Sequence, residues 1–393
     1  MNNPLKTYLN ENMSLMNDNV YKLFEILFNV HEWICHEIVI LNIISKEMRN
    51  LVMDSSLKIN FIMMHNINNK RFQQIFNSLK RNNLFRNVIS VHLFNNRGVG
   101  VIETIKELNL QNIVSVDIGN NLLGNNDDLA DLAKRLRLCP LTTLQVNDNN
   151  FNSGFLNLLL KNNNFLNLVL FDISYNIIGV EGANIIASEL LRFGKLRKLN
   201  ICNCSIRKEG AESIARNIGQ CTGLTSLNVS FNDIGTKVAI EFLKTGLVSL
   251  NLRNNSINDE NEEFASKLNC LTRLKKLNLA DNYILKPSKF GEALQNLELL
   301  NLSDVGFNDK ELPSKLELNT TLTDLDLSVN DIECDAAEHI IFSLNCTNLF
   351  SLDLSENQID DGVDGIVKYC QEKFLALKYL DTDDNMLWEK RYS

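Results

Sequence analysis

The sequence predicts an α/β fold, a horseshoe-shaped solenoid with a parallel β-sheet on its concave side and helices on its convex side. The first observation is a pattern of eleven residues that recurs twelve times between Val88 and Leu387. Positions 1, 4, 6 and 11 of this pattern are apolar, position 9 is usually Asn, and the others are free. The second is the spacing of 23 to 28 residues between successive copies, enough for the crossover that joins two parallel strands. The third is the helical spacing of apolar residues in the linking segments.

Each copy of the pattern is expected to form one strand, and each linking segment one helix. The copies begin at Val88, Ile113, Leu141, Leu168, Leu196, Leu224, Leu247, Leu274, Leu297, Leu322, Leu349 and Leu377. Helices are expected over Val180–Leu191, Lys208–Ile218 and Asp335–Leu344, where apolar residues recur at helical spacing. The units of 23 residues, which begin at Leu224 and Leu274, leave room for only a short helix.

The clearest copies of the pattern include Leu224–Ile234 (LTSLNVSFNDI) and Leu322–Ile332 (LTDLDLSVNDI). They resemble the leucine-rich repeat. The helix starts GVEGA at Gly179 and KEGA at Lys208 resemble those of the ribonuclease-inhibitor-like subclass, which has long repeats. The resemblance implies a non-catalytic module that binds other proteins along its concave face.

The Asn at position 9 has a structural role. The chain turns out of the strand there, and an inward amide can pair with backbone groups that would otherwise be buried without partners. Cys204 and Val305 replace this Asn in two copies. We expect backbone groups beside Val305 to lack side-chain partners, at a cost of about 1–3 kcal/mol if nothing compensates.

The composition argues against several classes of function. A net charge of −9 over 393 residues argues against a nucleic-acid-binding protein. No apolar run approaches the ~18 residues of a membrane span, and the polar N-terminal residues show no secretory signal. The nine cysteines include no CxxC pair, so we expect a reduced protein in the cytoplasm or the nucleus.

Chemistry-bearing motifs are missing from the sequence. The five His residues form no nucleophile motif with Ser or Cys and an acid. Cys202 and Cys204 are spaced as strand neighbours, but no second pair follows at a spacing suited to a metal ion. We therefore expect no catalytic residue, no metal and no cofactor.

The free positions inside the pattern are expected to face solvent on the concave side, because side chains alternate along a strand. Aromatic residues rimmed by charge are typical of binding hot spots. The residues expected to contact a protein partner are Tyr175, Phe231, Phe350, Tyr379, Asp326, Asp353, Asp381, Arg197 and Lys198. The aspartates end a polar column at position 5, which favours a basic partner surface. Basic patches are expected in the fifth repeat (Arg192, Lys195, Arg197, Lys198) and the eighth (Arg273, Lys275, Lys276). In the alternative, loops or the N-terminal segment cover some of the aromatic rings.

The segment before the repeats divides into a polar tail (1–16), three short helices (17–64) and a connecting helix (65–87), followed by a solenoid of about 12 repeats (88–393). The stretches NVYKLFEIL and HEIVILNIISKEMRNLVMDSSL resemble an F-box. In that eukaryotic family the F-box docks on the Skp-type adaptor of a cullin ubiquitin ligase, and the repeats hold the substrate. The resemblance implies that Leu23, Ile26 and Leu27 contact such an adaptor. The usual Leu-Pro opening is missing, because Met16 and Asn17 stand there.

Three alternatives stay open at this point. In the first, the N-terminal helices are a cap that covers the open end of the core, and the protein is a stand-alone scaffold or inhibitor, similar to ribonuclease inhibitors or actin regulators. In the second, the protein acts on a GTPase as the Ran activator of the long-repeat subclass does, with Arg97 or Arg207 facing the partner. In the third, the C-terminal end, where only Trp388–Ser393 follow the last copy, is a surface for self-association.

Overall fold

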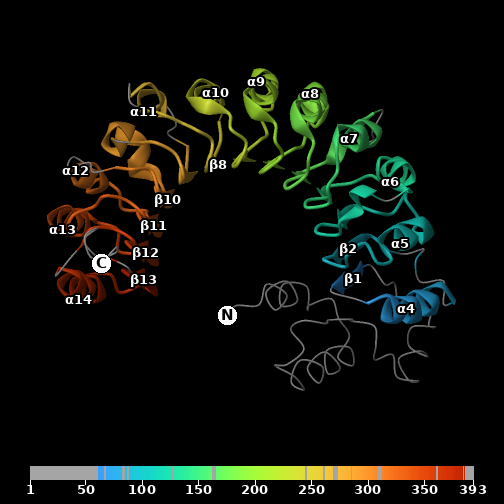
Figure 1. Cartoon of the computed structure of the whole chain (residues 1–393), viewed down its shortest axis with the longest axis horizontal. Coiled ribbons are helices and arrows are strands. Elements are labelled where there is room, and N and C mark those ends of the chain that lie inside the picture. Colours follow the sequence, from blue (N-terminus) through green and yellow to red (C-terminus); the bar gives the residue numbers. More distant parts are fainter. Residues whose placement is uncertain are drawn as a thin grey trace, which may run out of the picture.

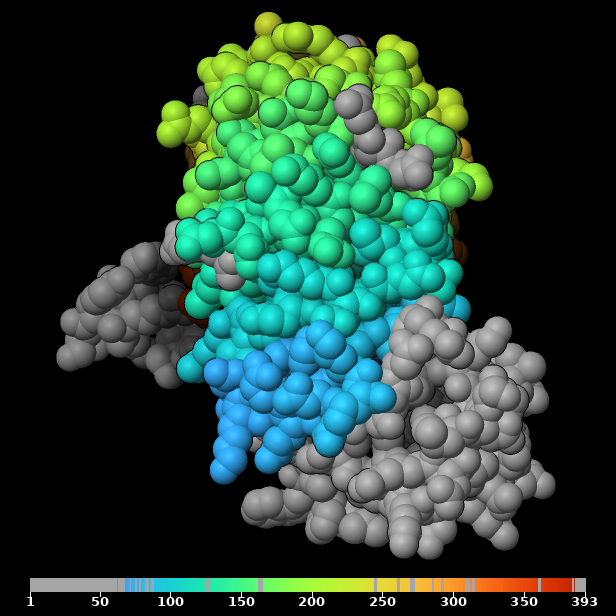
Figure 2. Space-filling model, turned by 90° about the vertical axis from the view of Figure 1, so that its right-hand side faces the viewer, coloured from blue at the N-terminus to red at the C-terminus, as the bar shows by residue number. Residues whose placement is uncertain are grey.

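The computed structural model describes residues 61–65, 68–81, 85, 88–125, 127–161, 165–243, 246–259, 262–268, 273–284, 286–307, 312–359, 362–383 and 385. Within these residues the chain forms one curved sheet with helices on its outer side (Figure 1). Figure 2 shows the early repeats stacked as continuous layers, from α4 at the blue end through the green repeats above it. No helix of the described part is both long enough and apolar enough to cross a membrane.

The sheet has thirteen strands in sequence order, and all neighbours pair in parallel. The strands are β1 (Phe61–His65), β2 (Ser90–Phe94), β3 (Ser115–Asp117), β4 (Thr143–Gln145), β5 (Leu170–Asp172), β6 (Lys198–Asn200), β7 (Ser226–Asn228), β8 (Ser249–Asn251), β9 (Lys276–Asn278), β10 (Leu299–Asn301), β11 (Asp324–Asp326), β12 (Ser351–Asp353) and β13 (Tyr379–Asp381). From β3 on, each strand covers positions 3 to 5 of the pattern. The predicted solenoid is therefore confirmed, with one strand per copy.

The crossovers lie on the convex side. The α-helices are α4 (Asn69–Arg81), α5 (Val101–Glu107), α6 (Leu129–Leu136), α7 (Ser153–Leu160), α8 (Gly179–Glu189), α9 (Arg207–Ile218), α10 (Gly235–Phe242), α11 (Glu263–Leu268), α12 (Leu312–Leu316), α13 (Cys334–Ser343) and α14 (Val363–Lys373). The 3-10 segments are η3 (Leu123–Asn125), η4 (Phe165–Asn167), η5 (Leu190–Arg192) and η6 (Pro287–Asn296). Helices α8, α9 and α13 confirm the three helices expected from apolar spacing. The two 23-residue units carry α10, of eight residues, and η6.

The core is a continuous rod between the sheet and the helices. Position 1 is buried in the eleven copies from Val88 to Leu349, and only Leu377 of the last copy is partly exposed. Position 4 of each strand from β2 to β12 is buried between two more accessible neighbours. Each repeat thus buries its apolar side chains only against its neighbours, as a stacked solenoid requires.

The sheet begins one strand earlier than the predicted start at residue 88. β1 pairs with β2, with Phe61 opposite Ser90 and His65 opposite Phe94. Its sequence FIMMH lacks the leucines and the Asn of the pattern, which is why sequence analysis placed residues 61–64 in the N-terminal cap. The connecting helix expected over 65–87 is α4. Its Phe72 packs where a Cβ on Gly100 would overlap the ring, so a side chain at that position would push α4 off the first repeats.

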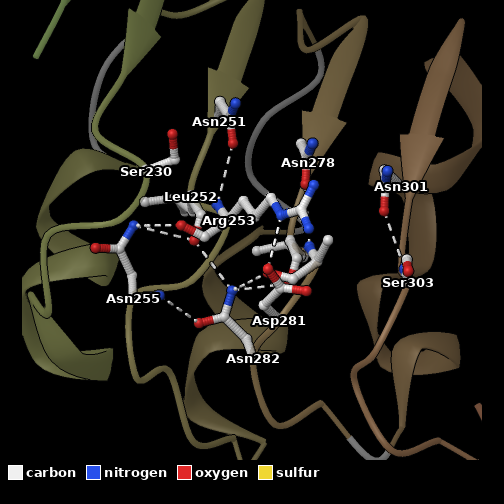
Figure 3. A network of polar contacts seen from close by, with 12 residues as sticks. Ser230, Asn251, Leu252, Arg253, Asn255, Asn278, Asp281, Asn282, Asn301 and Ser303 are labelled. Atoms are coloured by element: carbon white, nitrogen blue, oxygen red, sulfur yellow. Dashed lines mark hydrogen bonds and ion pairs between the residues drawn. The ribbon is translucent and has the colours of Figure 1, made fainter. Parts of the chain in front are cut away.

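The position 9 asparagines form the ladder that was predicted. Asn282 Nδ2 donates to the carbonyl oxygens of Leu252 (3.0 Å), Leu279 (2.8 Å) and Ala280 (3.1 Å). Its Oδ1 accepts the backbone N–H of Asn255 at 3.1 Å (Figure 3). The same oxygen accepts the N–H of Ile257 at 3.0 Å, also from the preceding repeat. Each amide therefore closes its own turn and ties two repeats together.

The two substituted positions of the ladder are only partly compensated. Cys204 keeps one bond of the ladder, from Sγ to the Ile173 carbonyl at 3.3 Å. Val305 is fully buried and has no polar side-chain atom, but its backbone carbonyl accepts the N–H of Ile284 at 2.9 Å. The backbone thus takes over one of the bonds that an Asn would make. The predicted weak point is partly compensated in this way.

Candidate binding face

The inner surface of the sheet is built by positions 3 and 5 of the pattern. In β7, for example, Ser226 and Asn228 are half-buried while Leu227 between them is buried. The strands pair in register, so their position 5 residues stand side by side and form one row. This central row contains His92, Asp117, Gln145, Asp172, Asn200, Asn228, Asn251, Asn278, Asn301, Asp326, Asp353 and Asp381. The predicted polar column is therefore a continuous feature of the concave face.

The central row also has a structural task that the sequence analysis missed. Asp353 Oδ1 accepts the backbone N–H of Ser355 at 3.0 Å and its hydroxyl at 2.6 Å, so the side chain closes the turn that follows the strand. Asp326 binds Ser328 in the same way, at 3.1 and 2.7 Å. Asp381 accepts the N–H two residues further on at 3.0 Å. The sequence signal was an Asp or Asn followed two positions later by Ser.

Tyr175 and Phe231 lie at position 8, in the turn beyond the strand, and not on the strand itself. They occupy the rim of the concave face and are 49% and 38% exposed. Both residues have left-handed backbone conformations, with φ of 55° and 56°. Position 8 is left-handed in every described copy that holds it, and Asn or Asp fills most of these copies. Two large aromatic residues therefore stand where the backbone favours small polar ones.

Arg253 joins Phe231 to the next repeats. Its guanidinium carbon lies 5.5 Å from the centre of the Phe231 ring, and its Nε donates to Asp281 Oδ2 at 2.7 Å (Figure 3). Sequence analysis missed this residue, although it is the one cation at position 7 among the twelve copies. On the other side, the neighbouring Cys202 raises the pKa of the Tyr175 phenol, through its charge and through a hydrogen bond. The rim from Tyr175 to Asp281 thus carries two rings and a paired cation.

Phe350 and Tyr379 form a second aromatic pair at the C-terminal end of the sheet. Their ring centres are 5.2 Å apart at an interplanar angle of 63°, and Lys378 lies 5.3 Å from the Phe350 ring centre. Tyr379 is 62% exposed. The structure therefore separates the four predicted aromatic residues into two pairs, one near the middle repeats and one at the end.

Arg197 and Lys198 are exposed on the fifth repeat, as expected. Lys198 is the first residue of β6, and Lys276 holds the equivalent place in β9. Arg97 and Arg207, considered for a GTPase partner, are in left-handed turns with φ of 52° and 54°. The three leucine and isoleucine residues expected to contact an adaptor, Leu23, Ile26 and Leu27, lie outside the described residues.

The cysteines of the described residues are all free thiols. Burial raises the pKa of Cys204 to about 12, so its thiol stays protonated at neutral pH and is a poor metal ligand. Burial also raises the pKa of Cys139 to about 12 and that of Cys370 to about 11. No cluster of three or more His, Cys, Asp or Glu side chains suited to a metal ion occurs in the described part of the chain.

The comparison with protein families agrees with this architecture. The protein family described as Leucine Rich repeat matches residues 220–240, 318–338 and 345–362. No curated protein matches the chain. Two similar solved structures are internalins of Listeria monocytogenes. One is 18% identical, with a TM-score of 0.44, over 85% of this chain and 92% of that one. The other, internalin C2, is 19% identical, with a TM-score of 0.39, over 66% of this chain and 95% of that one. The repeats and the sheet together identify the fold as a leucine-rich repeat solenoid.

Proposed function

We propose that this protein binds another protein along its concave face and its rim, without catalysing a reaction. The observation that carries this proposal is the pair of exposed aromatic residues, Tyr175 and Phe231, in left-handed turns. A bulky residue in this conformation costs roughly 1 kcal/mol or more relative to an unstrained one. Much of each ring stays open to solvent in the free protein, 49% of Tyr175 and 38% of Phe231. A contact that forms only with a partner accounts for both rings.

The rim has the composition of an interaction hot spot. Aromatic rings and arginine dominate the energetics of protein interfaces because they bury large areas with few rotatable bonds. Here Arg253 is held over Phe231 by its ion pair with Asp281, so its orientation is fixed before a partner arrives. Preorganisation of this kind lowers the entropy lost on binding.

The C-terminal end of the face favours a basic surface on the partner. Asp353 and Asp381 lie in register on β12 and β13, and Asp324 and Asp326 precede them on β11. The contacts of Asp353 with its own turn use Oδ1, through the N–H and the hydroxyl of Ser355. The field of these aspartates mainly accelerates association and selects the partner, and adds less to affinity.

We further propose that the protein is a substrate-recognition adaptor, with its N-terminal segment on a Skp-type protein and its repeats on the substrate. The F-box-like sequence around Leu23, Ile26 and Leu27 supports this reading, and the repeat architecture is compatible with it. The competing reading is a stand-alone scaffold or inhibitor, in which the same helices only cover the end of the core. The two readings differ in whether Leu23 faces a second protein.

The concave-face proposal is tested by affinity purification from the source cell with quantitative mass spectrometry. Proteins that bind the wild type should be depleted at least about fivefold with Tyr175→Ala and Phe231→Ala combined, the loss expected for two hot-spot side chains. Asn203→Ala with Asn254→Ala, at the same position of the pattern, is the matched control and should retain them. If the aromatic variant and the wild type retain the same proteins in equal amounts, Tyr175 and Phe231 are not part of the interface.

The adaptor reading is tested with a purified Skp-type protein. Leu23→Asp should abolish co-purification, because an unpaired carboxylate in an apolar interface costs several kcal/mol. The circular dichroism spectrum and the melting temperature of the repeats should stay unchanged. A wild-type chain that never retains the Skp-type protein leaves the scaffold as the function.

A further inference from the structure

Five consecutive strands, β6 to β10, carry no carboxylate at positions 3 and 5, the two strand positions that face the concave side. Position 5 is Asn in all five strands, and position 3 holds Lys198, Ser226, Ser249, Lys276 and Leu299. Carboxylates border this region on both sides, with Asp172 on β5 and Asp324 and Asp326 on β11. We call the inner face of β6 to β10 the central window. In a chain with net charge −9, it is a neutral to basic area bordered by Asp172 on one side and by the two aspartates of β11 on the other.

Two lysines stand in the same register at position 3 of the window. Lys198 and Lys276 are exposed, and Ser226 and Ser249 lie between them on the two intervening strands. Three steps between strands separate the lysine Cα atoms by about 14 Å. Neither lysine forms an ion pair with any residue that the structure describes. Arg197 beside Lys198 is also exposed, and its guanidinium lies where a side chain on Gly223 would collide with it.

Several other cations near the window already have partners within the protein. These pairs are Arg192 with Glu189 (2.8 Å), Lys195 with Asn167 (2.8 Å), Lys275 with Glu298 (3.8 Å) and Arg253 with Asp281 (2.7 Å). Lys198 and Lys276 on the strands and Arg197 beside Lys198 are exposed cations of this face, and Arg273 before β9 is exposed as well.

The asparagines of the window add hydrogen-bond donors. The side-chain oxygens of Asn228, Asn251 and Asn278 accept the backbone N–H two residues ahead, at 3.1, 3.0 and 3.0 Å. Because a backbone N–H fixes the oxygen in place, each amide presents its NH2 group as the end available to a ligand. The middle of the window is thus lined with donors and cations, which suit carboxylates and carbonyl oxygens.

We propose that the central window binds an acidic, extended segment of the partner protein, laid across strands β6 to β9. An extended chain advances about 3.3 Å per residue, so carboxylates four residues apart lie about 13 Å apart. This spacing matches the distance between Lys198 and Lys276. The backbone of the segment lies over Asn228 and Asn251, whose NH2 groups meet its carbonyl oxygens. An apolar residue of the partner then reaches Phe231 at the rim.

The acidic borders of the window favour a short peptide segment over a nucleic acid. A nucleic acid carries charge continuously along its backbone and would run onto Asp172 at one side and Asp326 at the other. A protein segment can place its carboxylates over the lysines and neutral or basic residues beyond them. The same borders limit the acidic part of the segment to the width of a few strands.

This inference rests on the proposed concave-face function and names the chemistry of its partner. The test uses the full chain and four fluorescent probes: an acidic Glu-Ser decapeptide, a Gly-Ser decapeptide, a Lys-Ser decapeptide and a single-stranded oligonucleotide. Fluorescence anisotropy is measured at low and high salt, about 50 and 300 mM NaCl, because exposed ion pairs weaken with screening. The test variant is Lys198→Glu with Lys276→Glu. The matched control is Lys208→Glu with Lys237→Glu, on the convex helices α9 and α10.

The acidic peptide should bind the wild type and the control alike, and bind the test variant about tenfold more weakly at low salt. Lys198→Gln with Lys276→Gln should give a smaller loss, which guards against a misfolded charge-reversal variant. The inference is overturned if the acidic peptide does not bind the wild type, if both charge-reversed variants lose it equally, or if the oligonucleotide binds more tightly through the same lysines. In that event a partner that still depends on Tyr175 and Phe231 leaves the proposed function intact.

Discussion

Replacing one asparagine of the position 9 ladder should reveal how much each rung contributes to stability. Asn232 Nδ2 donates to the carbonyl oxygens of Ile201 (2.8 Å), Val229 (3.0 Å) and Ser230 (2.9 Å). Its Oδ1 accepts the N–H groups of Cys204 (3.0 Å) and Ile206 (3.3 Å). Asn232 is 2% exposed, so water does not replace these five bonds easily when the amide is removed.

The expected cost of Asn232→Val follows from this inventory. The two N–H donors would be buried without an acceptor, at about 1–3 kcal/mol each, and the carbonyl oxygens add a smaller penalty. The backbone can shift to recover part of the loss, as the carbonyl of Val305 does for Ile284. We therefore expect the free energy of unfolding to fall by about 3–5 kcal/mol, a large fraction of the 5–15 kcal/mol typical of a domain.

The assay is urea unfolding followed by far-ultraviolet circular dichroism, with two further variants as controls. Asn232→Cys copies the natural Cys204 and should cost less, because a thiol can keep the bond that Cys204 makes at 3.3 Å. Val305→Asn restores the missing rung and should raise the free energy of unfolding by about 1 kcal/mol. The reasoning is refuted if Asn232→Val costs under about 1 kcal/mol, or if Val305→Asn destabilises the protein.

Three other predictions follow from single sites. Asn203→Phe should lower the free energy of unfolding by about 1 kcal/mol in thermal denaturation, because it places a ring in a left-handed turn; Phe231→Asn should leave stability nearly unchanged while it weakens partner binding. Burial raises the pKa of Asp259, which caps α11 through the N–H groups of Phe264 and Ala265. The folded state therefore favours the neutral acid, and the contribution of Asp259 to stability should fall as the pH rises. In urea unfolding from about pH 4 to pH 7, the free energy of unfolding of Asp259→Asn should rise relative to that of the wild type as the pH increases. The buried thiols should react with a thiol reagent only after urea is added, and fast labelling in native buffer would contradict their burial.

The architecture could be predicted from the sequence because the repeat encodes it many times over. Each copy predicts the same strand, the same buried leucines and the same turn. The pattern therefore remains recognisable where a single residue departs from it, as Val305 does. β1 was missed because FIMMH contains no leucine at the expected positions and no Asn. That strand follows from pairing with β2, a long-range interaction that no local pattern records.

For the binding face, the sequence predicts which residues lie on it but not which of them contact one another. The aromatic and charged residues could be placed in columns, but the sequence does not say which cations are neutralised by neighbouring repeats. Lys275 meets Glu298 across one strand step, whereas Lys198 and Lys276 face solvent, and only coordinates separate these cases. Arg253 was overlooked for a similar reason, since its two contacts lie in the repeats before and after its own.

The turn at position 8 connects the energetics of the fold with its proposed function. The solenoid imposes a left-handed backbone there whatever residue is present, as the φ of 55° at Val329 and of 51° at Glu356 shows. Asn and Asp relieve this strain, so they are the residues that folding alone would select. Tyr175 and Phe231 depart from that rule on the same rim, two repeats apart, next to the central window. If folding were the only requirement, reverting both to Asn would have no cost, and partner binding by the reverted protein is the measurement that decides between the two requirements.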